Sequence, residues 1–217
     1  MKLAVFNGSP RGEGSNTKIL LGHFINGFAA THGNFGELAY LNHVEDGNKF
    51  IKLFLEAEQV LLAFPLYTDC MPAIVKTFIE SLEPLCGREG NPDIGFIVQS
   101  GFPEPIHSRY LERYLEKLAL RLGCRYTGTV IKGGVEGIQA QPALMTRKLF
   151  NSFYQLGKTF GATGKFDDQI VRKLAQPERL TKFGFRVFKL LGERFYWDKM
   201  LTKNKAFKKR FAKPYAK

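Results

Sequence analysis

Residues 3–17 read LAVFNGSPRGEGSNT, a short apolar run followed by a loop rich in glycine and hydroxyl side chains. The apolar run, residues 3–6, is typical of a buried strand. Apolar residues recur at helical spacing over residues 19–28, so the loop leads from a strand into a helix. Glycines let a backbone approach an anion closely, and the free N–H groups of a helix N-terminus favour negative charge. We therefore expect this loop to bind a phosphate group.

The alternation of strand and helix continues along the chain. Short apolar runs predict four more strands, at residues 37–41, 60–64, 94–98 and 126–131. Apolar residues at helical spacing predict further helices at residues 50–57, 74–82, 110–122 and 142–160. Strands that alternate with helices form a parallel sheet with helices on both faces. We therefore predict an α/β fold of three layers.

The composition indicates a folded, reduced protein. The chain has 217 residues, of which 44% are hydrophobic, and this excludes a disordered chain and suits one sizeable domain. The first apolar run turns polar at Asn7, which leaves it too short for a signal peptide. The three cysteines lie 16 and 38 positions apart, a spacing that indicates neither a disulfide framework nor a metal site. We expect a cytoplasmic protein without a bound metal.

The positive charge is concentrated in the C-terminal quarter of the chain. The formal charge is +12. Residues 165–217 contain 16 Lys and Arg against five Asp and Glu, whereas residues 1–164 contain 16 against 15. The break falls at residues 161–164, which read GATG and are typical of a linker. We therefore expect an α/β domain over residues 1–164 and a basic helical extension over residues 165–217.

The basic extension has two interpretations. Phe183, Val187 and Leu190 form one apolar face beside Lys182 and Arg186. Such a segment attaches to an anionic membrane or to nucleic acid through its cations. Alternatively, it packs on the domain or on a second subunit and keeps its cations in water. The aromatic residues 195–197 favour packing.

The first loop offers donors for an anion. Ser9, Ser15 and Thr17 supply hydroxyl groups, and Arg11 supplies a positive charge. The loop lacks the Gly-Lys-Ser/Thr sequence of a P-loop and the third glycine of a dinucleotide fingerprint. It therefore suits a phosphomonoester better than ATP. The alternative is an ordinary helix, capped by serine or asparagine, after a flexible turn.

Two further loops follow the strands at 60–64 and 94–98. In a parallel sheet a ligand binds beyond the carboxyl ends of the strands, where the strand order reverses. Residues 65–72 read PLYTDCMP, and residues 100–105 read SGFPEP. Each loop combines an aromatic side chain with backbone amides that suit the face and edge of a flat ring. Alternatively, Tyr67 and Phe102 fill the rim of the core.

Together these loops resemble those of the flavodoxin-like NAD(P)H-dependent FMN reductase and quinone reductase family. Residues 8–11 with 15–17 look like its FMN-phosphate loop, and residues 65–67 followed by 71–72 and Lys76 look like its flavin-ring loop. The resemblance covers about residues 1–135. Residues 100–103, SGFP, replace the glycine-rich run that many members carry there. The family implies a five-stranded parallel sheet in the order 2-1-3-4-5, a flavodoxin-like three-layer sandwich.

The resemblance also implies an FMN cofactor, a nicotinamide hydride donor and a homodimer. The phosphate of FMN would bind Ser9, Arg11, Ser15, Asn16 and Thr17. The flavin ring would lie against the other two loops, namely Pro65, Leu66, Tyr67, Thr68, Asp69, Met71, Ser100, Gly101, Phe102 and Pro103. Tyr67 is the side chain expected nearest the ring, and no side-chain acid is required, because the cofactor performs the chemistry. NADH or NADPH would supply hydride, and a quinone, free flavin or similar small acceptor would take the electrons.

Two other functions remain open. A flavodoxin-type electron carrier would exchange electrons with protein partners and lack NAD(P)H activity of its own. Such carriers are usually acidic, whereas residues 1–164 are nearly neutral and the extension is positive. A non-enzymatic binding module would act through the basic extension. NAD(P)H oxidation separates the enzyme from the carrier, and flavin binding separates both of them from the module.

Overall fold

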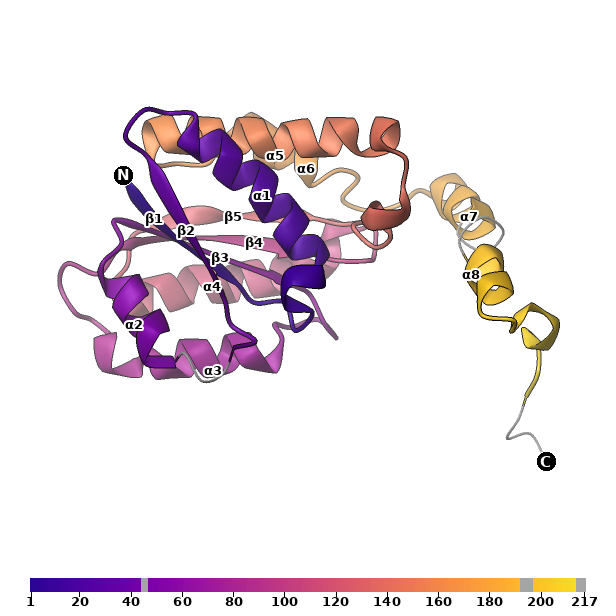
Figure 1. Ribbon diagram of the computed structural model, residues 1–217, viewed down its shortest axis with the longest axis horizontal. Coiled ribbons are helices and arrows are strands. Elements are labelled where there is room, and N and C mark those ends of the chain that lie inside the picture. Colours follow the sequence, from indigo (N-terminus) through magenta and orange to yellow (C-terminus); the bar gives the residue numbers. More distant parts are fainter. Residues whose placement is uncertain (44–46, 192–196, 214–217) are drawn as a thin grey trace. The chain divides into compact units, whose positions relative to one another are not determined.

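A computed structural model describes residues 1–43, 47–191 and 197–213 (Figure 1). The chain forms two compact units, Met1–Arg179 and Leu180–Lys217. The first unit contains the sheet and the helices that cover it, and the described part of the second contains short helices.

The centre of the first unit is a five-stranded parallel sheet. Its strands are β1 (Lys2–Asn7), β2 (Phe35–Tyr40), β3 (Gln59–Pro65), β4 (Asp93–Gln99) and β5 (Tyr126–Lys132). They lie in the order β2-β1-β3-β4-β5, and every neighbouring pair is parallel. The order reverses at β1, so the loops that leave β1 and β3 flank the point where ligands bind in such sheets. The predicted sheet and its strand order are confirmed.

Helices cover both faces of the sheet, as predicted (Figure 1). One face carries α1 (Asn16–Ala29), α5 (Ala143–Thr163) and α6 (Asp168–Leu174), and the other carries α2 (Gly47–Leu55), α3 (Ala73–Ser81) and α4 (Arg109–Leu122). Side chains alternate between the two faces along each strand. Leu3 and Val5 of β1 pack on the α1 side, whereas Phe6 packs against Phe50 and Phe78 of α2 and α3. Burial on both faces explains why the central strands are continuous apolar runs.

Helices α1 and α5 pack with their backbones in contact. Gly27 of α1 faces the carbonyl of Tyr154, and Gly157 of α5 faces the carbonyl of Phe24. A Cβ atom built at either glycine would lie 1.9 Å from the carbonyl oxygen opposite. Both positions therefore require glycine. Because α1 begins directly after the first loop, this contact also fixes where the N-terminus of α1 points.

The first unit ends at Arg179 rather than at residue 164. Phe166 and Leu174 are buried in the core that α1 and α5 share. The Arg109 guanidinium donates two hydrogen bonds to the Glu178 carboxylate, from Nε at 2.9 Å and from Nη2 at 2.7 Å. Residues 165–179 thus belong to the α/β body, because their few apolar side chains complete its core despite their charged neighbours.

The second unit contains α7 (Lys182–Leu191), α8 (Asp198–Lys203) and a 3₁₀ turn (Phe207–Lys209). These helices confirm the predicted helical character of the extension. Across residues 180–190 and 197–213, no side chain is buried. None of the helices in the described ranges has the length and apolar character needed to cross a bilayer.

Candidate functional site

The loop after β1 is organised by the last residue of that strand, Asn7. Its Nδ2 donates hydrogen bonds to the Gly12 carbonyl at 3.3 Å and to Ser15 Oγ at 3.2 Å. Its Oδ1 accepts a hydrogen bond from the Ser9 N–H at 3.0 Å. Gly12 has a φ of 52°, in the left-handed region that favours glycine. One buried asparagine therefore holds both ends of the loop in place.

Helix α1 begins at the end of this loop, with Ser15 as its N-cap. Ser15 Oγ accepts a hydrogen bond from the Lys18 N–H at 3.1 Å and donates one to the Gly12 carbonyl at 2.6 Å. The N–H groups of Asn16 and Thr17 have no acceptor among the described residues. Two amides and the positive end of the helix dipole are therefore available to an anion.

Two buried hydroxyl groups belong to the same segment. Ser9 is 2% exposed and Thr17 is 1% exposed. Ser9 Oγ accepts a hydrogen bond from the Arg11 N–H at 3.4 Å, and Thr17 Oγ1 accepts one from Gln99 Nε2 at 3.3 Å. Within the described residues, neither hydroxyl donates a hydrogen bond. Because a buried donor needs an acceptor, both protons suit the oxygens of a bound phosphate.

Arg11 reaches from this loop to the loop that follows β5. Its side chain is exposed, and Nη1 lies 3.7 Å from Glu136 Oε1. Arg11, which is expected to bind the phosphate, thus forms an ion pair with the Glu136 carboxylate in this structure. An exposed ion pair of this kind is weak, so a bound phosphate can compete with Glu136 for the guanidinium.

The loop after β3 forms a tight turn. The Tyr67 N–H donates to the Cys70 carbonyl at 2.8 Å, and the Cys70 N–H donates to the Tyr67 carbonyl at 3.0 Å. The two central residues, Thr68 and Asp69, have φ values of 47° and 63°. A positive φ is costly for a β-branched residue such as Thr68, and such strain concentrates at functional sites. In the described part of the chain, the N–H groups of Thr68 and Asp69 have no partner.

The loop after β4 is tied to the loop after β5. The Ser100 N–H donates to the Lys132 carbonyl at 3.0 Å, and the Val135 N–H donates to the Ser100 carbonyl at 2.9 Å. The Phe102 side chain is 65% exposed, and that of Tyr67 is 44% exposed. Much of each ring is therefore accessible to a flat ligand.

Hydrogen bonds join the three predicted loops along one edge of the sheet. The Gly8 N–H donates to the Ala63 carbonyl at 2.7 Å, which ties the first loop to the end of β3. The Leu66 N–H donates to the Gln99 carbonyl at 2.7 Å, which ties the second loop to the end of β4. Other predicted residues differ in exposure: Pro65 and Leu66 are buried, Met71 and Pro103 are half-buried, and Asp69 and Gly101 are exposed.

Three residues whose side chains form hydrogen bonds at this edge were not identified from the sequence: Asn7, Gln99 and Gln139. Gln139 Nε2 donates to the Gly14 carbonyl at 2.9 Å and to Asn16 Oδ1 at 3.0 Å. The sequence does carry a signal for Asn7 and Gln99, because each is a polar residue that ends an otherwise apolar strand. Gln139 has no such signal, since it lies 123 positions from Asn16 and meets it only in the folded chain.

Lys132 ends β5 beside Gln99. The strand register pairs these two residues, so their side chains lie on the same face of the sheet. Burial lowers the pKa of Lys132 from its usual value of 10.5. Within residues 1–43, 47–191 and 197–213, its ammonium group has neither an ion pair nor a hydrogen bond. The poorly solvated ammonium group of Lys132 therefore belongs to the strand next to Gln99, the residue that donates a hydrogen bond to Thr17.

Replacing Lys132 with methionine is expected to stabilise the fold by about 1 kcal/mol at neutral pH, because it removes an unpaired, half-buried charge. The gain should shrink as the pH rises from the lowered pKa toward 10.5, where the unfolded chain also loses the proton. Urea denaturation at neutral and at alkaline pH measures both effects. The exposed Lys117→Gln variant serves as the control. A less stable Lys132→Met protein would show that this ammonium group has a stabilising partner.

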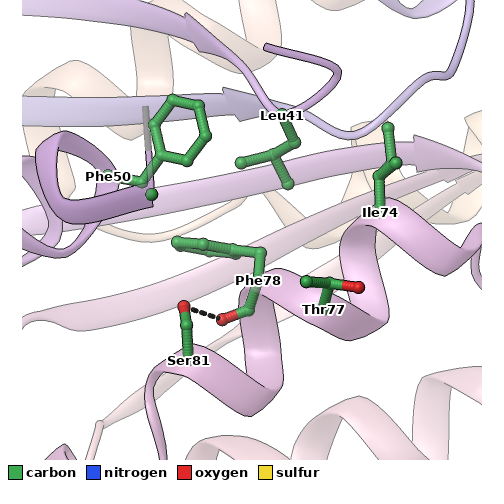
Figure 2. A pocket seen from close by; sticks show the side chains of 7 residues that line it. Leu41, Phe50, Ile74, Thr77, Phe78 and Ser81 are labelled. Carbon is green, nitrogen blue, oxygen red and sulfur yellow. Dashed lines mark hydrogen bonds between the residues drawn. The ribbon is translucent and has the colours of Figure 1, made fainter. Parts of the chain in front are cut away.

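A separate apolar pocket of about 110 Å³ lies between α2 and α3 (Figure 2). Figure 2 shows Leu41 and Phe50 facing Phe78, whose carbonyl accepts a hydrogen bond from Ser81 Oγ at 2.6 Å. None of the residues expected to bind FMN lines this pocket. It is also smaller than the roughly 300 Å³ at which small-molecule sites begin. The pocket is therefore separate from the candidate site at the edge of the sheet.

Comparisons with known proteins reveal relatives in structure. No family model and no curated protein matches the sequence. An FMN-dependent NADH-azoreductase from Bacillus anthracis, solved in complex with FMN, matches with a TM-score of 0.57 and 14% identity, covering 74% of this chain and 100% of that one. An NAD(P)H:quinone oxidoreductase from Methanothermobacter marburgensis matches with a TM-score of 0.59 and 13% identity, covering 74% and 96%. An NADH:FMN oxidoreductase in its apo form matches with a TM-score of 0.56 and 15% identity, covering 81% and 96%. At these identities the likeness confirms the flavodoxin-like fold.

Proposed function

We propose that this protein is an FMN-dependent NAD(P)H oxidoreductase that passes electrons to a small acceptor such as a quinone or a free flavin. One observation carries the proposal. The buried hydroxyls of Ser9, in the loop after β1, and of Thr17, in the first turn of α1, donate no hydrogen bond among the described residues, and the amides of Asn16 and Thr17 donate none there either. This donor set fits a phosphate monoester. An ordinary capped helix has no need of two buried hydroxyl donors beside its free amides.

The flavin ring is proposed to lie against the loops after β3 and β4. The Leu66–Gln99 hydrogen bond joins these loops, and each of them exposes an aromatic side chain, Tyr67 or Phe102. The amides of Thr68 and Asp69 are the donors available to the polar edge of the ring. Phosphate donors, aromatic faces and edge donors thus belong to adjacent strand ends, which is the arrangement that FMN requires.

The proposed role of this chain's residues is to bind and orient FMN, because FMN supplies the hydride chemistry when it is bound. The hydroxyls of Ser9 and Thr17 and the first amides of α1 would hold the phosphate. The strained turn at Thr68 and Asp69 would direct N–H dipoles at the ring edge, where negative charge develops during reduction. Tyr67 would lie nearest the ring. No side-chain acid or base is assigned, since the preorganised amides provide the stabilisation.

Known structures with this fold support the assignment by their activities. Their names describe an NADH-azoreductase, a quinone oxidoreductase and an FMN oxidoreductase, and the first of these holds FMN. All three names give a nicotinamide donor and a small acceptor, and two of them give FMN. We propose the same three components for this protein, and a homodimer as its assembly.

The visible absorption spectrum of the purified protein tests the proposal. After incubation with FMN and gel filtration, the protein is expected to keep the yellow absorption of a flavin. Anaerobic addition of NADH or of NADPH, in separate samples, is expected to bleach it, and a quinone should then restore the colour. A protein that retains no flavin would contradict the proposal. A flavin that neither nicotinamide bleaches would identify an electron carrier instead.

A further inference from the structure

The second unit, Leu180–Lys217, combines strong positive charge with exposed apolar side chains. Its sequence contains 12 Lys and Arg residues and two acidic residues, a formal charge of +10 over 38 residues. Nine of its large apolar side chains are exposed: Phe183, Phe185, Val187, Phe188, Leu190, Trp197, Met200, Phe207 and Phe211. Water-soluble surfaces rarely expose so many apolar groups together, and such groups mark an interaction surface.

Helix α7 separates the two kinds of side chain. Lys182, Arg186 and Lys189 follow the spacing i, i+4, i+7, which aligns them in one stripe along the helix. Apolar residues occupy the remainder of its circumference, and five of them, Phe183, Phe185, Val187, Phe188 and Leu190, are between 38% and 76% exposed. A short helix with a narrow cationic stripe and a wide apolar face has the pattern of an interfacial helix.

The segment after α7 continues the same combination. The Arg210 guanidinium lies 4.1 Å from the ring centre of Phe207 and 4.9 Å from that of Phe211. Its Nη1 also lies 3.7 Å from Asp198 Oδ1. Phe211 is itself 82% exposed. Arginine beside exposed aromatic rings is suited to the boundary between polar headgroups and acyl chains.

The described part of this unit has no interior of its own. Across residues 180–190 and 197–213, every side chain is exposed or half-buried. A chain of this size without a core cannot offset the entropy lost in ordering it, so its apolar face needs a partner. The charge of +10 selects a partner with an anionic surface. Nucleic acid would neutralise the cations but would leave the phenylalanine side chains in water, whereas a bilayer accepts both.

We propose that the unit Leu180–Lys217 docks on anionic lipid bilayers, with the apolar face of α7 at the acyl-chain boundary and its cationic stripe among the headgroups. The unit then holds the α/β body at a membrane surface without crossing the membrane. This inference goes beyond the oxidoreductase function and does not depend on flavin binding, so either can fail alone.

Vesicle co-sedimentation of the full-length protein tests the proposal. The protein is expected to sediment with vesicles of phosphatidylcholine and phosphatidylserine, and about 10-fold or more weakly with phosphatidylcholine alone. Raising the salt concentration should reduce binding to the anionic vesicles. Equal binding to both vesicle types, or no binding to either, would overturn the proposal.

Two variants of α7 separate the contributions of charge and apolar contact. Replacing Lys182, Arg186 and Lys189 with glutamine should weaken binding about 100-fold, since each surface cation contributes about fivefold. The Phe185→Ser/Phe188→Ser variant should weaken it about 30-fold and leave the salt dependence in place. The control replaces three exposed cations of the body, Lys117, Arg121 and Lys173, with glutamine, and it should bind as the wild type does.

The competing partners give different results in the same assay. If the unit packs on the body or on a second copy, the Phe185→Ser/Phe188→Ser variant will lower the thermal stability or the oligomeric state and leave vesicle binding unchanged. If the partner is nucleic acid, the protein will be retained on duplex DNA, and DNA will compete with the vesicles regardless of Phe185 and Phe188. Either result would overturn the membrane proposal.

Discussion

Replacing Gly27 with alanine is expected to destabilise the α/β body by about 4 kcal/mol, a large part of the stability of a domain of this size. The added Cβ would lie 1.9 Å from the Tyr154 carbonyl oxygen and 2.8 Å from its carbon. These are backbone atoms in the middle of α5, so they cannot rotate away as a flexible side chain could. The α1–α5 contact must open, and with it the packing of Phe24 and Phe28 against Phe160.

The matched control lies in the same helix. Gly22 has no atom within 4 Å of a Cβ built on it, so Gly22→Ala is expected to stabilise the protein by about 0.5–1 kcal/mol through helix propensity. Urea denaturation followed by circular dichroism measures both variants. Gly157→Ala should repeat the loss at Gly27, because its Cβ would lie 1.9 Å from the Phe24 carbonyl oxygen. A Gly27→Ala protein as stable as Gly22→Ala would contradict the close approach of α1 and α5.

The difference between these glycines shows what the sequence can and cannot predict about the fold. Apolar spacing locates α1 and α5 and predicts that Phe24 and Phe28 lie on one face of α1, because that signal is local. Gly22 and Gly27 look alike in the sequence, since the feature that distinguishes them is a helix more than a hundred positions away. The boundary predicted at residue 164 lies too early in the chain for a similar reason. Phe166 and Leu174 are only two apolar residues within a charged segment, and their burial depends on helices distant in the sequence.

The candidate site likewise has features that the sequence predicts and features that it does not. Its three loops follow from strand endings and turn residues, which are local features, and the sheet order brings them to one edge. The side chains that arrange the loops come from elsewhere: Asn7 and Gln99 from strand ends, and Gln139 from the 3₁₀ turn after β5. The ion pair of Arg11 with Glu136 depends on the same long-range contact. Long-range polar partners are decided by packing, which periodicity does not describe.

Removing the two buried hydroxyls of the first loop, in Ser9→Ala/Thr17→Val, is expected to raise the dissociation constant for FMN about 1,000-fold. Each hydroxyl would donate one hydrogen bond to a charged phosphate, and such bonds contribute about 2 kcal/mol each. The change also removes the acceptor of Gln99 Nε2 and that of the Arg11 N–H, so a loss of stability of about 1 kcal/mol should accompany it. Fluorescence titration of the folded apo variant with FMN measures the affinity separately from that loss.

The double variant Ser152→Ala/Thr159→Val makes the comparison decisive. Its hydroxyls belong to α5, where Ser152 Oγ donates to the Lys148 carbonyl at 2.9 Å and Thr159 Oγ1 donates to the Gln155 carbonyl at 3.1 Å. Their protons are already engaged, so FMN affinity should be unchanged. If the first loop is only a capped helix after a turn, the two double variants will bind FMN equally. A phosphate site requires them to differ, because the hydroxyls of Ser9 and Thr17, unlike those of Ser152 and Thr159, are buried and donate to no group among the described residues.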